Sequence, residues 1–394
     1  MFTLRTVLIA ACTAILTLLP SGIEGAPITP GNLVIYRVGD GSGTLTSAAT
    51  PVFVDEYDTS GNLIQSIAMP TTVSGSNRRL TASGTAISEG QLTVSADGNW
   101  VVLTGYDADV GTTGVASTTS AAVNRVVARI NIADGEPDTS TALSDAYSGN
   151  NIRGVASLDG SQFWLSGTGT STSNGVRYTT HGGNSSTRLS SSPTNIRTVR
   201  IFNGQLFASM MTGSFRVATV GTGTPTGPAD SQTITNLPGY ATSDWSNYAF
   251  VMFDLDPTAD FNGTGLDTLY VTVDSGTPGG GVYKWSWNPS TSLWEQKGSV
   301  ALTNVRGLTG FHHGSSVTLY VTTPDTLETL TDTSGYGNDM TGSFTTLATA
   351  ASNTVFRGVA MVPIPEAGPW AMSGSLLAVA GLLWLGRRLL CPGC

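Results

Sequence analysis

The 394-residue chain is poor in charge. Charged residues make up 11% of it, against about 25% in ordinary soluble proteins. Long amphipathic helices need charged outer faces, so this composition disfavours them. The net charge is -9, and no basic run occurs away from the ends of the chain. The electrostatic footprint of a nucleic-acid-binding protein is therefore missing, and we exclude nucleic acid as a partner.

Residues that commonly carry chemistry are also scarce. The three cysteines are Cys12 near the start and Cys391 and Cys394 at the end, so the body between them has none. An exported body without disulfides depends on core packing and strand pairing, which favours a large sheet protein. The three histidines lack metal-ligand spacing, and no nucleophile elbow, phosphate loop or dinucleotide fingerprint occurs. We therefore expect a binding protein more readily than an enzyme.

Residues 1–26 have the three-part plan of a secretory signal peptide. Arg5 precedes an apolar stretch from about Val7 to Leu19, and Pro20 and small residues follow. The stretch is short for a membrane span. We expect the secretion translocon to export the chain and cleavage to fall between Gly22 and Ala26.

Residues 27–363 are predicted to form a repetitive all-β domain. Short apolar or alternating runs such as LVIYRVG, WVVLTGY and VTLYVTT are separated by Gly, Asn, Asp and Pro turn signals. This pattern is typical of a sandwich, a barrel or a propeller. Gly reaches 48 residues, which suits a fold with many tight turns.

A repeat distinguishes among these folds. Three copies have Asn, an aliphatic residue, Arg, a strand, a polar turn and a second strand, and a fourth shares the Arg and the strand that contains it. The copies are NIRGVASLDG from Asn151, NIRTVRIFNG from Asn195, NVRGLTGFHHG from Asn304 and TVFRGVAMV from Thr354, with looser ones at Gln91 and Tyr248. Successive copies lie roughly 45 to 60 residues apart, the size of one four-stranded propeller blade.

The repeat is incomplete at both ends. The run from Phe356 to Val362 has no strands after it, and the strands from Leu33 to Met69 have no inner strand before them. Both deficits disappear if the C-terminal run joins the N-terminal strands in one blade, which closes the ring and hides the sheet edges. We therefore predict a β-propeller with six blades, with seven as the alternative.

Four arginines, Arg153, Arg197, Arg306 and Arg357, hold the same place in four copies of the repeat. The residue that opens an inner strand of a propeller lies near one mouth of the central channel. The four arginines could therefore form a basic ring that receives an anionic ligand. The alternative is that they bind backbone carbonyls between blades and recur because the blade recurs.

A possible calcium site lies in the segment DFNGTGLDTLYV, which begins at Asp260. It resembles the calcium-loop segment of FG-GAP propeller repeats, in which carboxylate and amide oxygens surround a hard cation. The resemblance implies Asp260, Asn262 and Asp267 as ligands, with Gly265 in the turn. A plain Asn-Gly turn is the alternative, and no other cofactor is expected.

A hairpin rich in tryptophan is predicted in GVYKWSWNPSTSLWEQKG. Trp285 and Trp287 are two residues apart and so share one face of a strand, with Trp294 on the returning strand. Such a cluster could stack on sugar rings, or it could fill the space between neighbouring blades.

The segment 364–394 ends the chain with a hydrophobic stretch and two arginines. About 17 uncharged residues, at about 370–386, would span roughly 25 Å as a helix, enough for a thin bilayer. Arg387 and Arg388 follow at once, which leaves them in the cytoplasm and the body outside. The physics alone predicts a single-pass C-terminal anchor.

This tail resembles the PEP-CTERM sorting domain of Gram-negative bacteria. The motif positions are Pro365, Glu366 and Ala367, before the hydrophobic segment and the pair Arg387 and Arg388. The resemblance implies recognition by an exosortase, a membrane-embedded processing enzyme. The chain would be anchored in the inner membrane before processing and would reach the cell surface or an exopolysaccharide matrix afterwards.

We therefore predict an exported surface or matrix protein with a non-enzymatic adhesion or binding propeller and a polysaccharide or matrix partner. Two alternatives remain. One is a secreted propeller enzyme that acts on polysaccharide, and the other is a binding protein permanently anchored in the periplasm by its tail.

Overall fold

The computed structural model of the chain describes residues 25–243, 245–274 and 279–365. The predicted signal peptide up to residue 24, the membrane helix and the sorting residues after Pro365 lie outside this range. Within it the structure is all-β, with two short 3₁₀ turns, Val115–Ser117 and Ser171–Ser173, and no α-helix. None of the described helices is long and apolar enough to cross a membrane.

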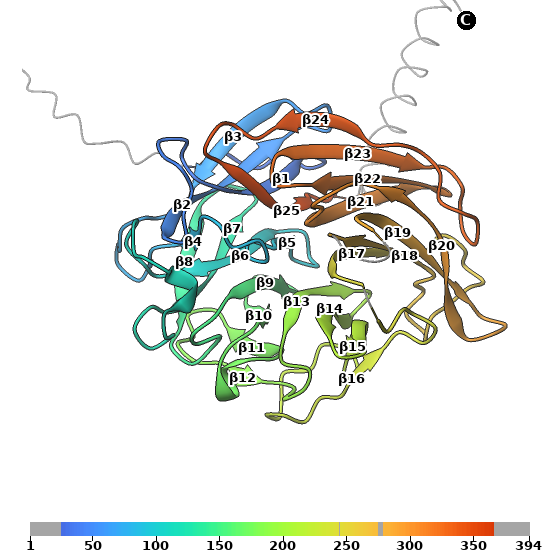
Figure 1. The fold of residues 1–394 in the computed structure, drawn as a ribbon, viewed down its shortest axis with the longest axis horizontal. Coiled ribbons are helices and arrows are strands. Elements are labelled where there is room, and N and C mark those ends of the chain that lie inside the picture. The colour runs from blue at the N-terminus through green and yellow to red at the C-terminus, as the bar shows by residue number, and fades with distance from the viewer. Residues whose placement is uncertain (1–24, 244, 275–278, 366–394) are drawn as a thin grey trace, which may run out of the picture.

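Four separate sheets each contain four antiparallel strands that follow one another in sequence. Their strands are β9 (Ile152–Ser157), β10 (Gln162–Gly167), β11 (Arg177–Thr180) and β12 (Thr187–Arg188); β13 (Ile196–Phe202), β14 (Gln205–Thr212), β15 (Phe215–Val220) and β16 (Ile234–Asn236); β17 (Asn247–Phe253), β18 (Thr268–Val273), β19 (Gly281–Asn288) and β20 (Leu293–Ala301); and β21 (Gly307–His313), β22 (Ser316–Thr322), β23 (Thr326–Asp332) and β24 (Thr345–Thr349). The sheets are arranged around a centre as in a propeller (Figure 1).

The remaining strands form one nine-stranded sheet. They are β1 (Leu33–Val38), β2 (Ala49–Tyr57), β3 (Leu63–Ala68), β4 (Thr81–Ser83), β5 (Thr93–Val94), β6 (Trp100–Tyr106), β7 (Arg125–Asn131), β8 (Pro137–Leu143) and β25 (Val355–Met361). Two runs of four strands can be followed in it, β25-β1-β2-β3 and β5-β6-β7-β8, and the short strand β4 joins them by pairing with β2 and β6.

The predicted joining of the two chain ends is confirmed. Strand β25 pairs antiparallel with β1, and Leu33 lies opposite Met361. The C-terminal strand thus supplies the inner strand that β1, β2 and β3 lack. Their sheet edge is covered, as the incomplete repeat required.

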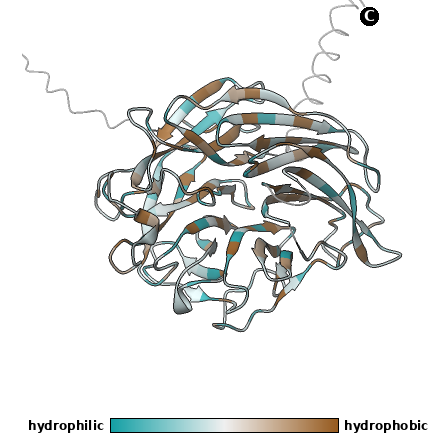
Figure 2. Ribbon diagram, in the orientation of Figure 1, coloured by the Kyte–Doolittle hydropathy of each residue, from teal (hydrophilic) through white to brown (hydrophobic). Residues whose placement is uncertain are grey.

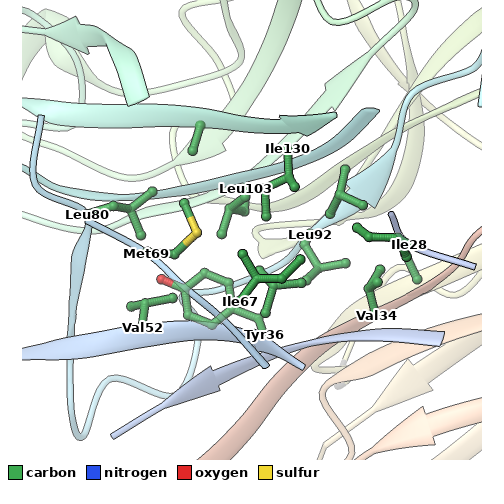
Figure 3. Packing of buried hydrophobic residues seen from close by; sticks show 14 of the residues in the cluster. Ile28, Val34, Tyr36, Val52, Ile67, Met69, Leu80, Leu92, Leu103 and Ile130 are labelled. Carbon is green, nitrogen blue, oxygen red and sulfur yellow. The ribbon is translucent and has the colours of Figure 1, made fainter. Parts of the chain in front are cut away.

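Hydrophobic side chains fill the spaces between neighbouring sheets. Hydrophobic residues recur along the strands (Figure 2), and the apolar side chains of β18, for example, are buried on both faces. Figure 3 shows one such space, where Val34 and Tyr36 of β1 face Leu103 of β6 and Ile130 of β7. A strand buried on both faces needs the β-branched and aromatic residues that the sequence supplies.

Candidate functional site

The first strand of each four-strand run faces the centre of the molecule. Going around the centre, β5 contacts β9, and contacts continue through β13, β17, β21 and β25 back to β5. These inner strands surround the centre of the molecule (Figure 1). All four predicted arginines lie near the start of an inner strand: Arg153 on β9, Arg197 on β13, Arg306 just before β21 and Arg357 on β25.

β-Bulges set the direction of these side chains. The strand register shifts at Arg153, at Arg197 and at Arg357, and a fourth shift falls at Tyr248 on β17. Just before β21, the Arg306 N–H donates to the Thr322 carbonyl at 2.8 Å. A bulge adds one unpaired residue to a strand and re-aims its side chain, and bulges are enriched beside functional sites. The same backbone irregularity therefore recurs on four of the inner strands.

Hydroxyl groups show that three of these positions are equivalent. The Ser166 hydroxyl of β10 donates to the Arg197 carbonyl of the next sheet at 3.2 Å, and the Ser209 hydroxyl of β14 donates in the same way to the Tyr248 carbonyl. The Thr322 hydroxyl of β22 repeats the contact with the Arg357 carbonyl. We name Arg153, Arg197, Tyr248, Arg306 and Arg357 the arginine cluster.

Backbone carbonyls hold part of the cluster, as the second alternative required. Arg153 Nη1 donates to the Ile196 carbonyl at 3.0 Å and to the Asn195 side chain. Arg357 Nη2 donates to the Ser83 carbonyl at 2.8 Å. The bonds of Arg153 join two separate sheets, whereas Arg357 and Ser83 both belong to the nine-stranded sheet.

Tyr248 lies between two of the guanidinium groups. The Arg197 Cζ lies 4.1 Å and the Arg306 Cζ 4.6 Å from the centre of its ring. Arg306 also forms a 3.0 Å ion pair with Asp274. Cation–π contacts of this kind stabilise guanidinium groups that have left bulk water. The repeat pattern does not single out Tyr248, because a tyrosine stands there in place of the recurring arginine.

Several donors of the cluster have no acceptor among the described residues. They are Nε of Arg153, Arg197 and Arg306, and Nη1 of Arg357. Arg153, Arg306 and Arg357 are at most 7% exposed. Most buried polar atoms in proteins have a partner, so these individual guanidinium nitrogens are exceptions that need an explanation. A bound anion would satisfy them.

The charge balance at the cluster is positive. Burial, and then the neighbouring Arg197, lower the pKa of Arg153 to about 10, so it stays protonated at neutral pH. Burial also raises the pKa of Glu89, although Arg357 and hydrogen bonds oppose that shift. Glu89 accepts bonds from the Tyr106 hydroxyl at 2.6 Å and the Ser83 N–H at 3.0 Å. The Glu89 oxygens thus accept hydrogen bonds from protein donors. The sequence pattern does not predict this site residue, because a single isolated Glu belongs to no motif.

A pocket of about 270 Å³ opens beside the cluster. Arg306 and Arg357 line it together with apolar side chains that include Phe356 and the 54%-exposed Ile87. We call it the arginine pocket. A charged end and apolar walls are the features of a site for a small anionic ligand.

The predicted calcium ligands are not brought together as a cluster of carboxylates. Asp267 is buried, and its Oδ2 accepts the Leu255 and Asp256 N–H groups at 2.9 and 2.6 Å. Asp260 is exposed and accepts the Gly265 N–H at 2.7 Å. Asn262 is exposed with φ 55°, as in a tight turn. In the described part of the chain no group of three or more His, Cys, Asp or Glu could hold a metal ion.

The three tryptophans lie in the core. Trp285, Trp287 and Trp294 are 5, 6 and 1% exposed and share one hydrophobic cluster. Phe261 packs edge-on against both Trp287 and Trp294, with ring centres 5.0 and 5.4 Å away. These rings are too buried to stack on a sugar. The prediction of glycan stacking is therefore replaced by its alternative, in which the tryptophans fill the space between neighbouring sheets.

No protein-family model matches the chain, and a search of curated proteins gives no match. Solved structures give distant likenesses. The periplasmic gluconolactonase of Pseudomonas aeruginosa is 12% identical, with a TM-score of 0.47 over 85% of this chain and 99% of that one. TolB of Acinetobacter baumannii is 9% identical, with a TM-score of 0.45 over 84% of this chain and 67% of that one. The propeller fold rests on the strand topology of the chain itself.

Proposed function

We propose that the chain is an exported, non-enzymatic binding protein of the cell surface or extracellular matrix. Its body is a six-bladed propeller, and the arginine pocket binds a carboxylate-bearing ligand such as an acidic sugar residue of a polysaccharide. The single observation that carries this proposal is the set of buried, unpaired guanidinium donors beside the pocket.

The count of six blades is supported by the division of the nine-stranded sheet. Its two four-strand runs, added to the four separate sheets, supply six inner strands that contact one another in a closed circle. Hydrophobic clusters lie between the neighbouring runs as well as between the separate sheets. In this division β4 is a bridge between two blades.

The ligand class follows from the chemistry of arginine. Guanidinium groups present donors in a planar fork that matches a carboxylate, and such charge-assisted bonds are stronger than neutral ones. The pocket of about 270 Å³ corresponds to the share of about nine water molecules in the liquid. One acidic sugar residue is of this order of size. The apolar wall formed by Phe356 and Ile87 suits the face of a sugar ring.

The hydrogen bonding of the carboxylates near the cluster favours ligand binding over catalysis. A glycosidase needs two carboxyl groups that flank the bond to be broken. Near the cluster, Glu89 is held by the Tyr106, Ser83 and Asn151 donors, and Asp274 is paired with Arg306. Neither carboxylate is placed to work on a ligand in the pocket.

Calorimetric titration of the full chain in detergent with a galacturonate oligomer tests the ligand proposal. We expect binding that the matching neutral oligomer does not show. Arg357→Gln should weaken it at least about tenfold, because one charge-assisted bond is lost. Arg79→Gln, which alters an arginine that is paired with Asp107 and does not line the arginine pocket, should leave it unchanged. Equal affinity for the neutral oligomer would overturn the proposal.

A second variant tests the pocket without replacing a buried arginine, because Arg357→Gln could lose binding through unfolding alone. Ile87 is exposed at the pocket, so Ile87→Trp should block the pocket while the fold stays intact. Unchanged galacturonate binding in this variant would move the ligand away from the arginine pocket.

Export and sorting are proposed on the order of the signal-like segment, the motif at Pro365, the hydrophobic stretch and the arginine pair. The test is the mass of the C-terminal peptide of the protein isolated from its own host, with surface and membrane fractions kept apart. An end near 365–368 in the surface fraction is the expected result. An intact tail through Cys394 in the membrane fraction would leave a permanently anchored protein.

A further inference from the structure

A second, smaller cavity lies toward the other end of the inner strands. Its volume is about 160 Å³, and every one of the six inner strands contributes to its wall. It is lined by later residues of these strands, such as Ser157 of β9 and Met361 of β25, whereas the arginine cluster lies near their starts. The two sites share no residue.

Arg200 of β13 is the one charged side chain among the described residues that line this cavity. It is 7% exposed, and its Nε has no hydrogen-bond partner in the described part of the chain. Its Nη2 makes only a long bond of 3.4 Å to the Leu308 carbonyl. A buried charge that lacks a counter-ion destabilises a fold unless a ligand or water compensates it. Burial lowers the pKa of Arg200 to about 10, so the guanidinium remains charged at neutral pH.

Two of the hydroxyl groups that line this cavity already donate to backbone carbonyls. Thr93 donates to the Val155 carbonyl at 3.0 Å and Ser157 to the Gln162 carbonyl at 2.6 Å. Thr309, in contrast, accepts the Met361 N–H at 3.1 Å, which leaves its hydroxyl hydrogen for another acceptor. The remaining wall is largely apolar and includes Phe202 and Phe253. The cavity therefore combines one cation, one hydroxyl donor and two aromatic side chains.

We infer that this cavity is a second ligand site and binds a small monocarboxylate with a short apolar end. The carboxylate would accept from Arg200 and Thr309, and the apolar end would lie against Phe202 and Phe253. The volume of about 160 Å³ corresponds to the share of about five water molecules, which suits an anion the size of propionate. An apolar wall favours such an anion over phosphate or sulfate, whose oxygens all require donors.

Titration of the full chain in detergent with sodium propionate, at fixed ionic strength in chloride, tests the inference. We expect saturable binding that Arg200→Met weakens at least about tenfold, through loss of a charge-assisted bond. Arg357→Gln, in the arginine pocket, should leave propionate binding unchanged. Propionate binding that survives Arg200→Met would overturn the inference, as would the absence of binding to the unaltered chain.

A steric variant separates loss of the site from loss of the fold. Ala96 is exposed and lines the cavity, so Ala96→Phe should close the cavity and abolish propionate binding without altering a buried residue. Sulfate or phosphate that binds more tightly than propionate would overturn the assignment to a carboxylate. Failure of galacturonate binding would overturn only the proposal for the arginine pocket, and failure of propionate binding would overturn only the proposal for this cavity.

Discussion

Lys284 of β19 and Asp332 at the end of β23 form an ion pair between two neighbouring sheets. Nζ lies 2.9 Å from Oδ2, and both side chains are fully buried. Lys284 also donates to the Ser334 hydroxyl and the Gly335 carbonyl, and the Tyr270 hydroxyl donates to the same Asp332 oxygen at 2.7 Å. Every donor of the ammonium group has an acceptor, which is the condition under which a buried charge is tolerated.

Removal of one partner should be costly. We expect Lys284→Met to lower the free energy of unfolding by about 3 to 5 kcal/mol, because Asp332 would remain buried without its counter-ion. Lys297→Met, which breaks the partly exposed pair with Glu295, should cost less than about 1 kcal/mol. Guanidinium chloride denaturation of both variants measures the difference. Equal losses in the free energy of unfolding would show that burial does not determine how much the Lys284–Asp332 pair contributes to stability.

Asp138 gives the fold a sensitivity to acid. Burial raises the pKa of this carboxyl, but hydrogen bonds from Ser140 and His181 outweigh burial and lower it from 3.8 to about 2. A folded pKa below the unfolded one means stability that is present above the unfolded value and is lost as pH falls from about 4 toward 2. Asp138→Asn should remove about 1 to 2 kcal/mol of this pH dependence. Urea denaturation across that range, with the exposed Asp325→Asn as control, checks the slope.

Gly358 permits the close approach that shuts the ring of strands. A Cβ at this position would lie 2.5 Å from the Gly90 carbonyl oxygen and 2.7 Å from the Leu92 nitrogen. Both are backbone atoms, so Gly358→Ala should push β25 and β5 apart and cost about 1 to 3 kcal/mol. Gly43→Ala, where a Cβ meets nothing within 4 Å, should stay within about 0.5 kcal/mol. Thermal unfolding that shows no difference between the two would contradict this account.

Calcium removal tests the loop that resembles a calcium site. The Asp267 carboxylate already accepts backbone N–H groups and the Thr268 hydroxyl. We therefore expect the midpoint of thermal unfolding to be the same in millimolar calcium and in excess chelator. A rise with calcium that Asp260→Asn abolishes would instead assign the loop to the cation.

The sequence repeat located the arginines but not all of the site. Strict alternation would place Ile196 and Val199 on opposite faces of β13, yet both belong to one core cluster. The bulge at Arg197 causes this change of face, and nothing in the local residue types announces a bulge. The same shift decides which way Arg200 points, so its cavity could not be predicted by counting residues.

The tryptophan hairpin shows that a correctly predicted strand face does not reveal what covers that face. The spacing of Trp285 and Trp287 correctly predicts one shared face, because no register shift falls between them. Whether that face meets solvent or a neighbouring sheet depends on Phe261 and on strands that lie elsewhere in the chain. Local patterns predict faces and turns, whereas burial depends on how distant blades pack.

The pairing of Leu33 with Met361 also orders events in time. A ribosome makes the first of these residues long before the second, so the edge of β1 stays unpaired while almost the whole body is synthesised. Ring closure is then a single late step that depends on one distant strand. Until ring closure occurs, the unpaired edge of β1 can pair with another chain in an aggregate or bind a chaperone. A protease that cleaves incomplete chains could recognise them by this one unpaired edge.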